Sequence, residues 1–172
     1  MTTTPKVAVI GLGNIGKTIA HNLVKGNRPV ILASRTLADA ISFATELGNL
    51  ATARETKDAI HDADIIVMSV WFNTQHELFE QYSTELNGKI IIDPSNPIAP
   101  DEHGKNKKII GEKESAGQLN AVLLPAGASL VKVFGTLGAA SLDNAAFQSP
   151  EKSVLFYATD QAHTESVVEQ LI

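Results

Sequence analysis

Short apolar runs alternate with longer amphipathic stretches along the first half of the chain. An unbroken apolar run is typical of a strand covered on both faces, whereas an apolar stripe at helical spacing predicts a surface helix. With short connections, this alternation predicts a doubly wound parallel α/β sheet. The predicted strands are residues 6–10, 29–33, 50–53, 65–70 and 89–92, and the predicted helices are residues 15–25, 37–47, 56–61 and a segment carrying Leu78, Phe79 and Tyr82.

The pattern changes at Asp93, after which Pro94, Pro97 and Pro100 follow at even spacing. Proline cannot continue a helix, so this segment is predicted to be an ordered crossing, followed by a mobile charged loop up to Glu114 that is either a lid or a solvated linker. A helix at 115–124, a strand at 130–134, a flexible small-residue segment at 135–140, a strand at 153–158 and a helix at 161–172 complete the prediction. The last helix is expected to expose an apolar face, which suggests a homodimer.

Composition and charge exclude several classes of function. The 172 residues are 44% hydrophobic and carry a net charge of −5, which argues against a nucleic-acid or anionic membrane surface. Cysteine is absent, which excludes disulfides and thiol catalysis, and no spacing of ligand residues marks a metal site. Because no leader and no apolar run of membrane-spanning length is present, a cytoplasmic protein with no membrane partner is expected.

Three glycines after the first predicted strand give the sequence its strongest chemical signal. Gly11 allows a tight turn, Gly13 allows the backbone to approach a pyrophosphate, and Gly16 allows the following helix to lie close to the sheet. The helix start also offers unpaired N–H groups to an anion. The whole turn is therefore predicted to bind a nucleotide: Gly11, Leu12, Gly13, Asn14, Ile15 and Gly16.

The same turn also fits a second motif. Residues 11–18 satisfy the pattern G-x-x-x-x-G-K-T of the phosphate loop of ATPases, with Lys17 and Thr18 in the functional places. Asp93, at the end of an apolar strand, fits a magnesium-binding position. A P-loop phosphohydrolase therefore stays open as an alternative.

The end of the second predicted strand, Ser34 and Arg35, indicates which nucleotide is bound. At this position in dinucleotide folds an acidic residue selects NAD, and an arginine accommodates the 2′-phosphate of NADP. No acidic residue lies between Val30 and Leu37. Arg35 offers a charge-assisted pair to phosphate, although it also fits an ordinary surface arginine beside a helix cap.

Further candidate residues follow the fourth and fifth predicted strands, in residues 69–73 and 93–96. Ligands of parallel sheets bind outside the carboxyl ends of the strands, so both segments belong to the expected binding edge. His76 is the one histidine expected near that edge, where it either contacts substrate or caps a solvated helix.

Taken in order, these segments resemble the deazaflavin-dependent NADP oxidoreductases. They are Gly-Leu-Gly-Asn-Ile-Gly, Ser34-Arg35, Ser69-Val70-Trp71, Asp93-Pro94-Ser95-Asn96-Pro97 and the stretch from Val131 to Ala139. The cytosolic domain of six-transmembrane ferric reductases is similar. The resemblance implies an NAD(P)-binding Rossmann fold and hydride transfer between NADPH and a small redox partner, which would be a deazaflavin, a flavin, a quinone or a ferric chelate.

Residue roles follow from this resemblance. Residues 12–15 would contact the pyrophosphate, and Ser34 with Arg35 would contact the 2′-phosphate. The nicotinamide side would be formed by Val70, Trp71, Asn96, Pro97, Gly138 and Ala139, and Ser69 is a further expected cofactor contact. No catalytic side chain is named, because the cofactors hold the chemistry of hydride transfer. Residues 1–172 are expected to form one dinucleotide-binding domain without the final strand and helix of related enzymes, which leaves a non-catalytic NADP(H)-binding module as a further alternative.

Overall fold

A mostly parallel sheet forms the centre of the computed structural model, which describes residues 4–150 and 154–172. Its order, β3-β2-β1-β4-β5-β8-β9, begins with the arrangement of dinucleotide-binding folds and places the switch point between β1 and β4. The predicted doubly wound fold is therefore confirmed. The strands are β1 (Val7–Ile10), β2 (Val30–Ala33), β3 (Ala51–Ala53), β4 (Ile65–Met68), β5 (Ile90–Asp93), β8 (Ser129–Val133) and β9 (Tyr157–Ala158).

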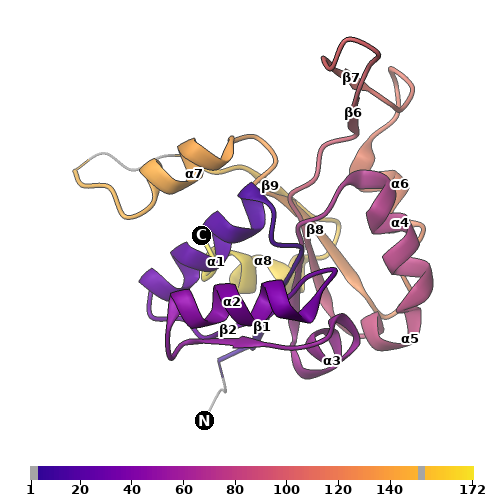
Figure 1. Ribbon diagram of the computed structural model, residues 1–172. Coiled ribbons are helices and arrows are strands. Elements are labelled where there is room, and N and C mark those ends of the chain that lie inside the picture. Colours follow the sequence, from indigo (N-terminus) through magenta and orange to yellow (C-terminus); the bar gives the residue numbers. More distant parts are fainter. Residues whose placement is uncertain (1–3, 151–153) are drawn as a thin grey trace.

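Each face of the sheet has its own hydrophobic core, because alternate residues of a strand point to opposite faces. In β1, Val7 and Val9 pack into one core, whereas Ala8 and Ile10 pack into the other. The helices that contribute side chains to the first core are α1 (Asn14–Lys25), α2 (Leu37–Leu47) and α8 (Glu165–Glu169). Those that contribute to the second core are α3 (Thr56–Asp62), α4 (Phe72–Gln81) and α5 (Ser83–Leu86). Figure 1 shows α1 and α2 side by side on the first face.

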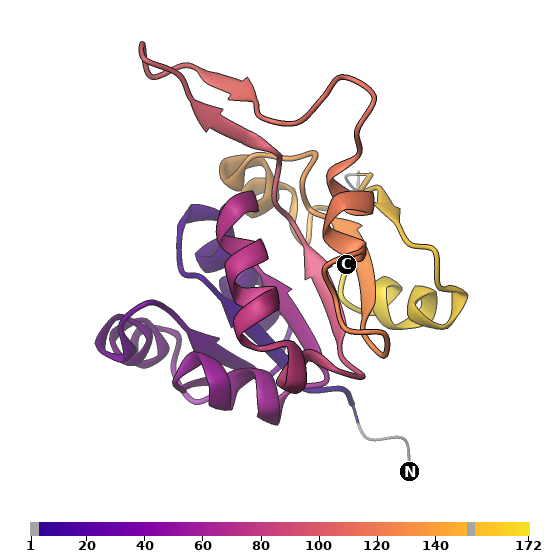
Figure 2. The ribbon, with the colours of Figure 1, turned by 90° about the vertical axis from the view of Figure 1, so that its right-hand side faces the viewer.

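The charged segment after the prolines is not the loop that the sequence predicted. It forms an antiparallel hairpin of β6 (Ile98–Pro100) and β7 (Asn106–Lys108), which extends beyond the body of the molecule (Figure 2). At its turn, the carboxylate of Asp101 accepts the backbone N–H groups of His103 and Lys105 at 2.9 and 2.8 Å. Every residue of β7 is exposed, so the strand has no apolar alternation for the sequence pattern to show.

The carboxyl-terminal third also differs from the prediction. The segment predicted to be flexible contains the start of a helix, because Gly138 caps α7 (Ala139–Ala145). Further along the chain, β9 pairs antiparallel with β8. The predicted strand at 153–158 is shortened to β9 in the described residues, and Ser153 lies outside them. The predicted final helix is divided into a 3₁₀ turn (Ala162–Thr164) and α8. The remaining helix, α6 (Ala116–Ala121), lies within its predicted range.

The apolar face of the last helix is largely covered. Val168 is fully buried, and Val167 and Leu171 pack against the first core, while Ile172 stays half exposed. The exposed face from which the sequence suggested a homodimer is therefore mostly part of the core.

Candidate functional site

The glycine turn between β1 and α1 is held against the end of β4. Gly11 has a φ of +93°, which side-chain-bearing residues rarely adopt. A Cβ at this position would overlap the Ser69 carbonyl oxygen and lie 2.6 Å from the Val70 side chain. A Cβ at Gly16 would overlap the Gly11 carbonyl oxygen, so both glycines are required by close packing.

Gly13, unlike Gly11 and Gly16, is not closely packed. No atom lies within 4 Å of the position that its Cβ would take. The first helical bond of α1 joins the Lys17 N–H to the Gly13 carbonyl at 2.9 Å, so the N–H groups of residues 14–16 have no helical acceptor. No acidic residue stands in the first turn of α1. Open space, unpaired N–H groups and the positive end of a helix dipole together form a cradle that fits a pyrophosphate.

The end of β2 lies directly beside this cradle. The Gly11 N–H donates to the Ala33 carbonyl at 2.9 Å, which places Ser34 next to the turn. The Ser34 hydroxyl donates to the Thr36 carbonyl at 2.8 Å, and Arg35 is exposed. Thr36 is the residue that caps α2 beside Arg35, but its hydroxyl donates to the Asp39 carboxylate and accepts no backbone N–H.

The structure does not support the ATPase alternative. The Lys17 ammonium lies 5.2 Å from the centre of the Phe43 ring on α2 instead of folding back over the turn. Asp93 is completely buried, and β4 separates its strand from β1. The Asp93 carboxylate is bound to protein groups and is not directed at the glycine turn.

The residues expected on the nicotinamide side lie at the ends of neighbouring strands. Ser69 and Val70 directly follow β4 and lie against the glycine turn. The Asn96 side-chain amide donates to the Gly135 carbonyl at 2.9 Å, which joins the segments that follow β5 and β8. Gly138 and Ala139 begin α7, which packs beside α1 (Figure 1). Fold and contacts bring these segments to one edge; their contacts with a cofactor stay predictions.

An apolar hollow of about 370 Å³ continues this edge toward the hairpin. It lies between the start of α4 and β6, next to the residues predicted to face the nicotinamide. The Trp71 indole, 63% exposed, stands at its border. The lining consists of Trp71, Phe72, Asn73, Ile98, Ala99, Pro100 and Ile109.

A polar cluster beneath the edge was not predicted from the sequence. It consists of Gln75, Asp93, Asn120 and Lys132, called the buried cluster below, of which the first three are fully buried. The ammonium of Lys132 lies 3.3 Å from the Asp93 carboxylate. A lysine inside the apolar run of the strand at 130–134 was the one signal in the sequence that a buried partner was present.

His76 contacts the buried cluster and does not line the hollow. Its Nε2 lies 2.9 Å from the Asn120 side-chain oxygen, and its ring meets Phe72 edge to face at 4.5 Å between centroids. Because that oxygen only accepts hydrogen bonds, Nε2 carries a proton.

Burial shifts the ionisation of Lys132. Loss of hydration lowers the pKa of its ammonium from the usual value, while the charge of Asp93 and the hydrogen bond to it act in the opposite direction. The three hydrogens of the ammonium have three acceptors: the Asp93 carboxylate at 3.3 Å, the Asp93 carbonyl at 3.2 Å and the Ser95 carbonyl. The ammonium is therefore occupied by protein groups.

The part of the chain that the structure describes holds neither a metal-binding cluster nor a membrane-spanning helix. Residues 4–150 and 154–172 hold no group of three or more His, Asp or Glu side chains arranged to bind a metal ion. None of the helices assigned in those residues has the length and apolar character needed to cross a bilayer.

Comparison with known families gives the site its context. Residues 6–97 match the family described as NADP oxidoreductase, coenzyme F420-dependent. The chain belongs to this family. The matched region contains the glycine turn, Ser34 and Arg35, and the strand ends up to Pro97, so the family resemblance seen in the sequence is confirmed.

Individual relatives share the same region. The chain is 26% identical over 138 residues to the metalloreductase STEAP3 of Rattus norvegicus, which covers 80% of this chain. It is 32% identical over 103 residues to a glutamyl-tRNA reductase of Methanococcus maripaludis, which covers 58% of this chain. In both cases the chain spans only 26% of the relative's length.

A solved structure resembles nearly the whole chain. A protein of Sinorhizobium meliloti superimposes with a TM-score of 0.85 at 29% sequence identity, covering 98% of this chain and 80% of its own. The similarity thus includes the hairpin and the carboxyl-terminal elements as well as the strands of the matched family region.

Proposed function

We propose that the chain is an NADP(H)-dependent oxidoreductase that catalyses hydride transfer between NADPH and a small redox partner. The proposal rests on two neighbouring features, the cradle at Gly13 and the position of Arg35. The open cradle at Gly13 fits a pyrophosphate, and Arg35 stands at the neighbouring strand end without an acidic residue between Val30 and Leu37. This pairing fits NADP better than NAD.

Each part of the site has one expected role. The N–H groups at the start of α1 bind the pyrophosphate, and Ser34 with Arg35 binds the 2′-phosphate. Val70, Asn96 and Gly138 border the nicotinamide position. NADPH supplies the hydride when it is bound, and the chain contributes distance, orientation and the exclusion of water.

The apolar hollow is the expected place of the redox partner. It begins at Trp71, which is itself predicted to face the nicotinamide, and at Ile98, which directly follows Pro97. Its lining favours a flat, weakly hydrated ring, such as a deazaflavin, a flavin or a quinone, over a hydrated ferric chelate. The family description supports a deazaflavin among these. Because the two relatives named above carry different substrates in their names, the partner is not transferred from either of them.

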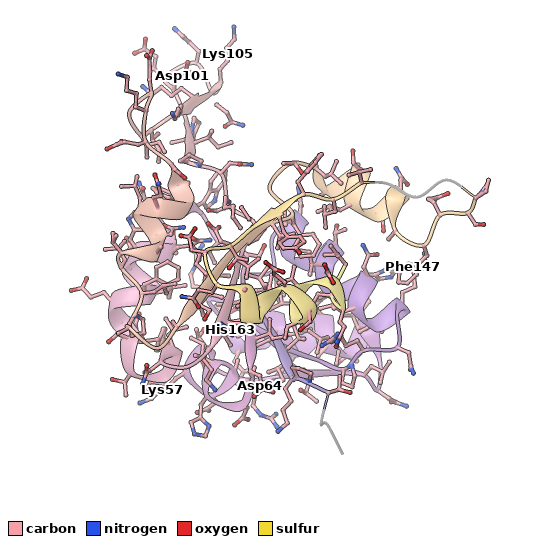
Figure 3. All side chains as sticks on the ribbon, turned by 180° about the vertical axis from the view of Figure 1, so that it is seen from behind. Lys57, Asp64, Asp101, Lys105, Phe147 and His163 are labelled. Atoms are coloured by element: carbon pink, nitrogen blue, oxygen red, sulfur yellow. The ribbon has the colours of Figure 1, made fainter. Side chains whose placement is uncertain are left out.

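Binding titrations test the choice of cofactor. NADPH, NADH and ATP with Mg²⁺ are titrated into the wild type and Arg35→Ala by calorimetry. Loss of a charged hydrogen bond to the 2′-phosphate should reduce the advantage of NADPH over NADH by roughly 1.5–3 kcal/mol, which is about 10- to 150-fold. The control Lys57→Ala also removes one positive charge, but Lys57 pairs with Glu85 at 3.2 Å and lies away from the hairpin end of the molecule (Figure 3). This variant should leave the ratio unchanged.

Three results would contradict the proposal. Tight binding of ATP with Mg²⁺ but not of NADPH would restore the phosphate-loop interpretation. Equal effects of Arg35→Ala and Lys57→Ala would mean that Arg35 acts only through overall charge. Binding of NADPH without its oxidation by any of the four partner classes would indicate a non-catalytic binding module.

A further inference from the structure

The ends of β4, β5 and β8 all meet at the buried cluster. These strand ends carry residues predicted to line the nicotinamide position, and the cluster lies directly beneath them. We propose that the buried cluster is a positioning device that holds the three strand ends in the arrangement required by the nicotinamide half of NADP(H). The inference rests on the proposed function, since it concerns the same cofactor.

On the side of β5, the cluster fixes the backbone from Asp93 to Ser95. The Lys132 ammonium binds both of their carbonyl oxygens, and the Asp93 carboxylate accepts the Ser95 N–H at 2.8 Å. Lys132 itself belongs to β8, so the same contacts join β5 to β8. Asn96 and Pro97, which are predicted to face the nicotinamide, follow immediately.

On the side of β4, Gln75 makes the corresponding connection. Its amide nitrogen donates to the Met68 carbonyl at 2.8 Å and to the Asp93 carboxylate at 2.9 Å. Met68 is the last residue of β4 and directly precedes Ser69 and Val70. A single side chain on α4 therefore joins the end of β4 to the end of β5.

Asn120 completes the network from α6. Its amide nitrogen donates to the Gln75 oxygen at 2.7 Å and to the Asp93 carboxylate at 2.9 Å, while its oxygen pairs with His76. Both hydrogens of each amide group are used, so neither amide can turn without losing bonds. A fully satisfied buried network of this kind specifies one arrangement of the elements it joins.

The cluster acts through the backbone and not by touching the cofactor. Gln75, Asp93 and Asn120 are each 0% exposed. The Lys132 side chain is 26% exposed, and its ammonium is bound to protein acceptors. Buried charge pairs add little net stability compared with well-packed apolar residues. Their location beneath three converging strand ends therefore points to positioning.

The experiment compares two ligands that differ in the nicotinamide half. NADPH is compared with 2′,5′-ADP, which contains the adenosine and 2′-phosphate but no nicotinamide. Lys132→Met frees the carbonyls of Asp93 and Ser95. If the correct arrangement is then populated about one-fifth to one-tenth of the time, the ratio of Kd for NADPH to Kd for 2′,5′-ADP rises about five- to tenfold.

Lys89 provides a matched control. Its ammonium also joins two backbone carbonyls, those of His61 and Ala63, at 3.0 and 2.6 Å. Lys89 directly precedes β5, so this contact lies at the amino end of the sheet, away from the cradle. Lys89→Met should lower the unfolding temperature without changing the ratio of the two dissociation constants.

If Lys132→Met does not fold, Gln75→Met gives the same comparison from the side of β4. This variant keeps the charge pair of Lys132 and Asp93 and is therefore expected to fold. A rise in the ratio in either cluster variant, with none in Lys89→Met, supports the inference. Equal weakening of both ligands, an unchanged ratio, or a rise in Lys89→Met as well would overturn it. If the wild type binds neither ligand, the proposed function itself fails; if it binds both and only the ratio fails to move, the positioning role alone is wrong.

Discussion

Gly13 and Gly16 show how two residues of one motif meet different physical demands. The Gly13 Cβ position is open, and its φ of −75° is accessible to alanine. Gly13→Ala should therefore change stability by less than about 0.5 kcal/mol. Because the added methyl group takes the space predicted for the pyrophosphate, it should weaken NADPH binding by about tenfold or more.

For Gly16→Ala we expect the opposite contrast, with the larger effect on stability and the smaller effect on NADPH binding. Its Cβ would overlap the Gly11 carbonyl oxygen, so the variant should lose about 1–3 kcal/mol of stability through overpacking. Urea unfolding and NADPH titration of both variants test this contrast. Unimpaired NADPH binding by Gly13→Ala would argue against a pyrophosphate at this turn.

At the scale of elements, the β6–β7 hairpin behaves as a unit separate from the sheet. The Asp101 carboxylate holds its turn through two backbone N–H groups, and Figure 3 shows Asp101 and Lys105 together at the tip. Asp101→Ala should open the hairpin and speed tryptic cleavage after Lys105 or Lys107 about fivefold or more, because two hydrogen bonds are lost. The unfolding temperature of the body should not change.

Glu102→Ala is the control for this prediction, since its side chain is largely exposed and faces His103 at 3.5 Å without holding the turn. Mass spectrometry of the fragments over time measures both variants. Equal cleavage rates, or first cuts within the sheet, would show that the Asp101 contacts do not govern the hairpin.

Elements with a strong apolar pattern could be predicted from the sequence, and elements without one could not. The runs that became β1, β2, β4 and β5 are buried on both faces, so hydrophobicity alone locates them. In the hairpin, β7 is polar and exposed along its whole length, and β6 has only three residues, so neither strand gives a clear apolar pattern. The small residues that begin α7 favour no structure by themselves, and the direction of β9 depends on pairing with β8 that no local pattern encodes.

The same distinction holds for the candidate site. The glycine turn and Arg35 are local in sequence, so the motif reveals them. Gln75 and Asn120 come from two separate helices and meet Asp93 only in the folded chain. Hydrogen-bond partners so distant in sequence leave no spacing that could be recognised.

At the scale of the whole molecule, the parallel sheet places every predicted cofactor contact on one edge. The glycine turn lies at the switch point between β1 and β4, Arg35 lies beyond the end of β2, and the residues predicted to face the nicotinamide lie at the ends of β4, β5 and β8. The hairpin and Trp71 extend this edge into an apolar hollow. This order fits a dinucleotide lying across the strand ends with its reactive ring toward the hollow.

The most direct test of this account is the transfer of deuterium from stereospecifically labelled NADPH. NADPH carrying deuterium in the 4R or the 4S position is mixed with an oxidised deazaflavin, whose ring carbon retains a transferred hydride while solvent supplies the accompanying proton. A cofactor held in one orientation should deliver the label from only one of the two forms. Equal transfer from both, or no oxidation of NADPH above the protein-free rate with a deazaflavin, flavin, quinone or ferric chelate, would contradict the proposed hydride transfer.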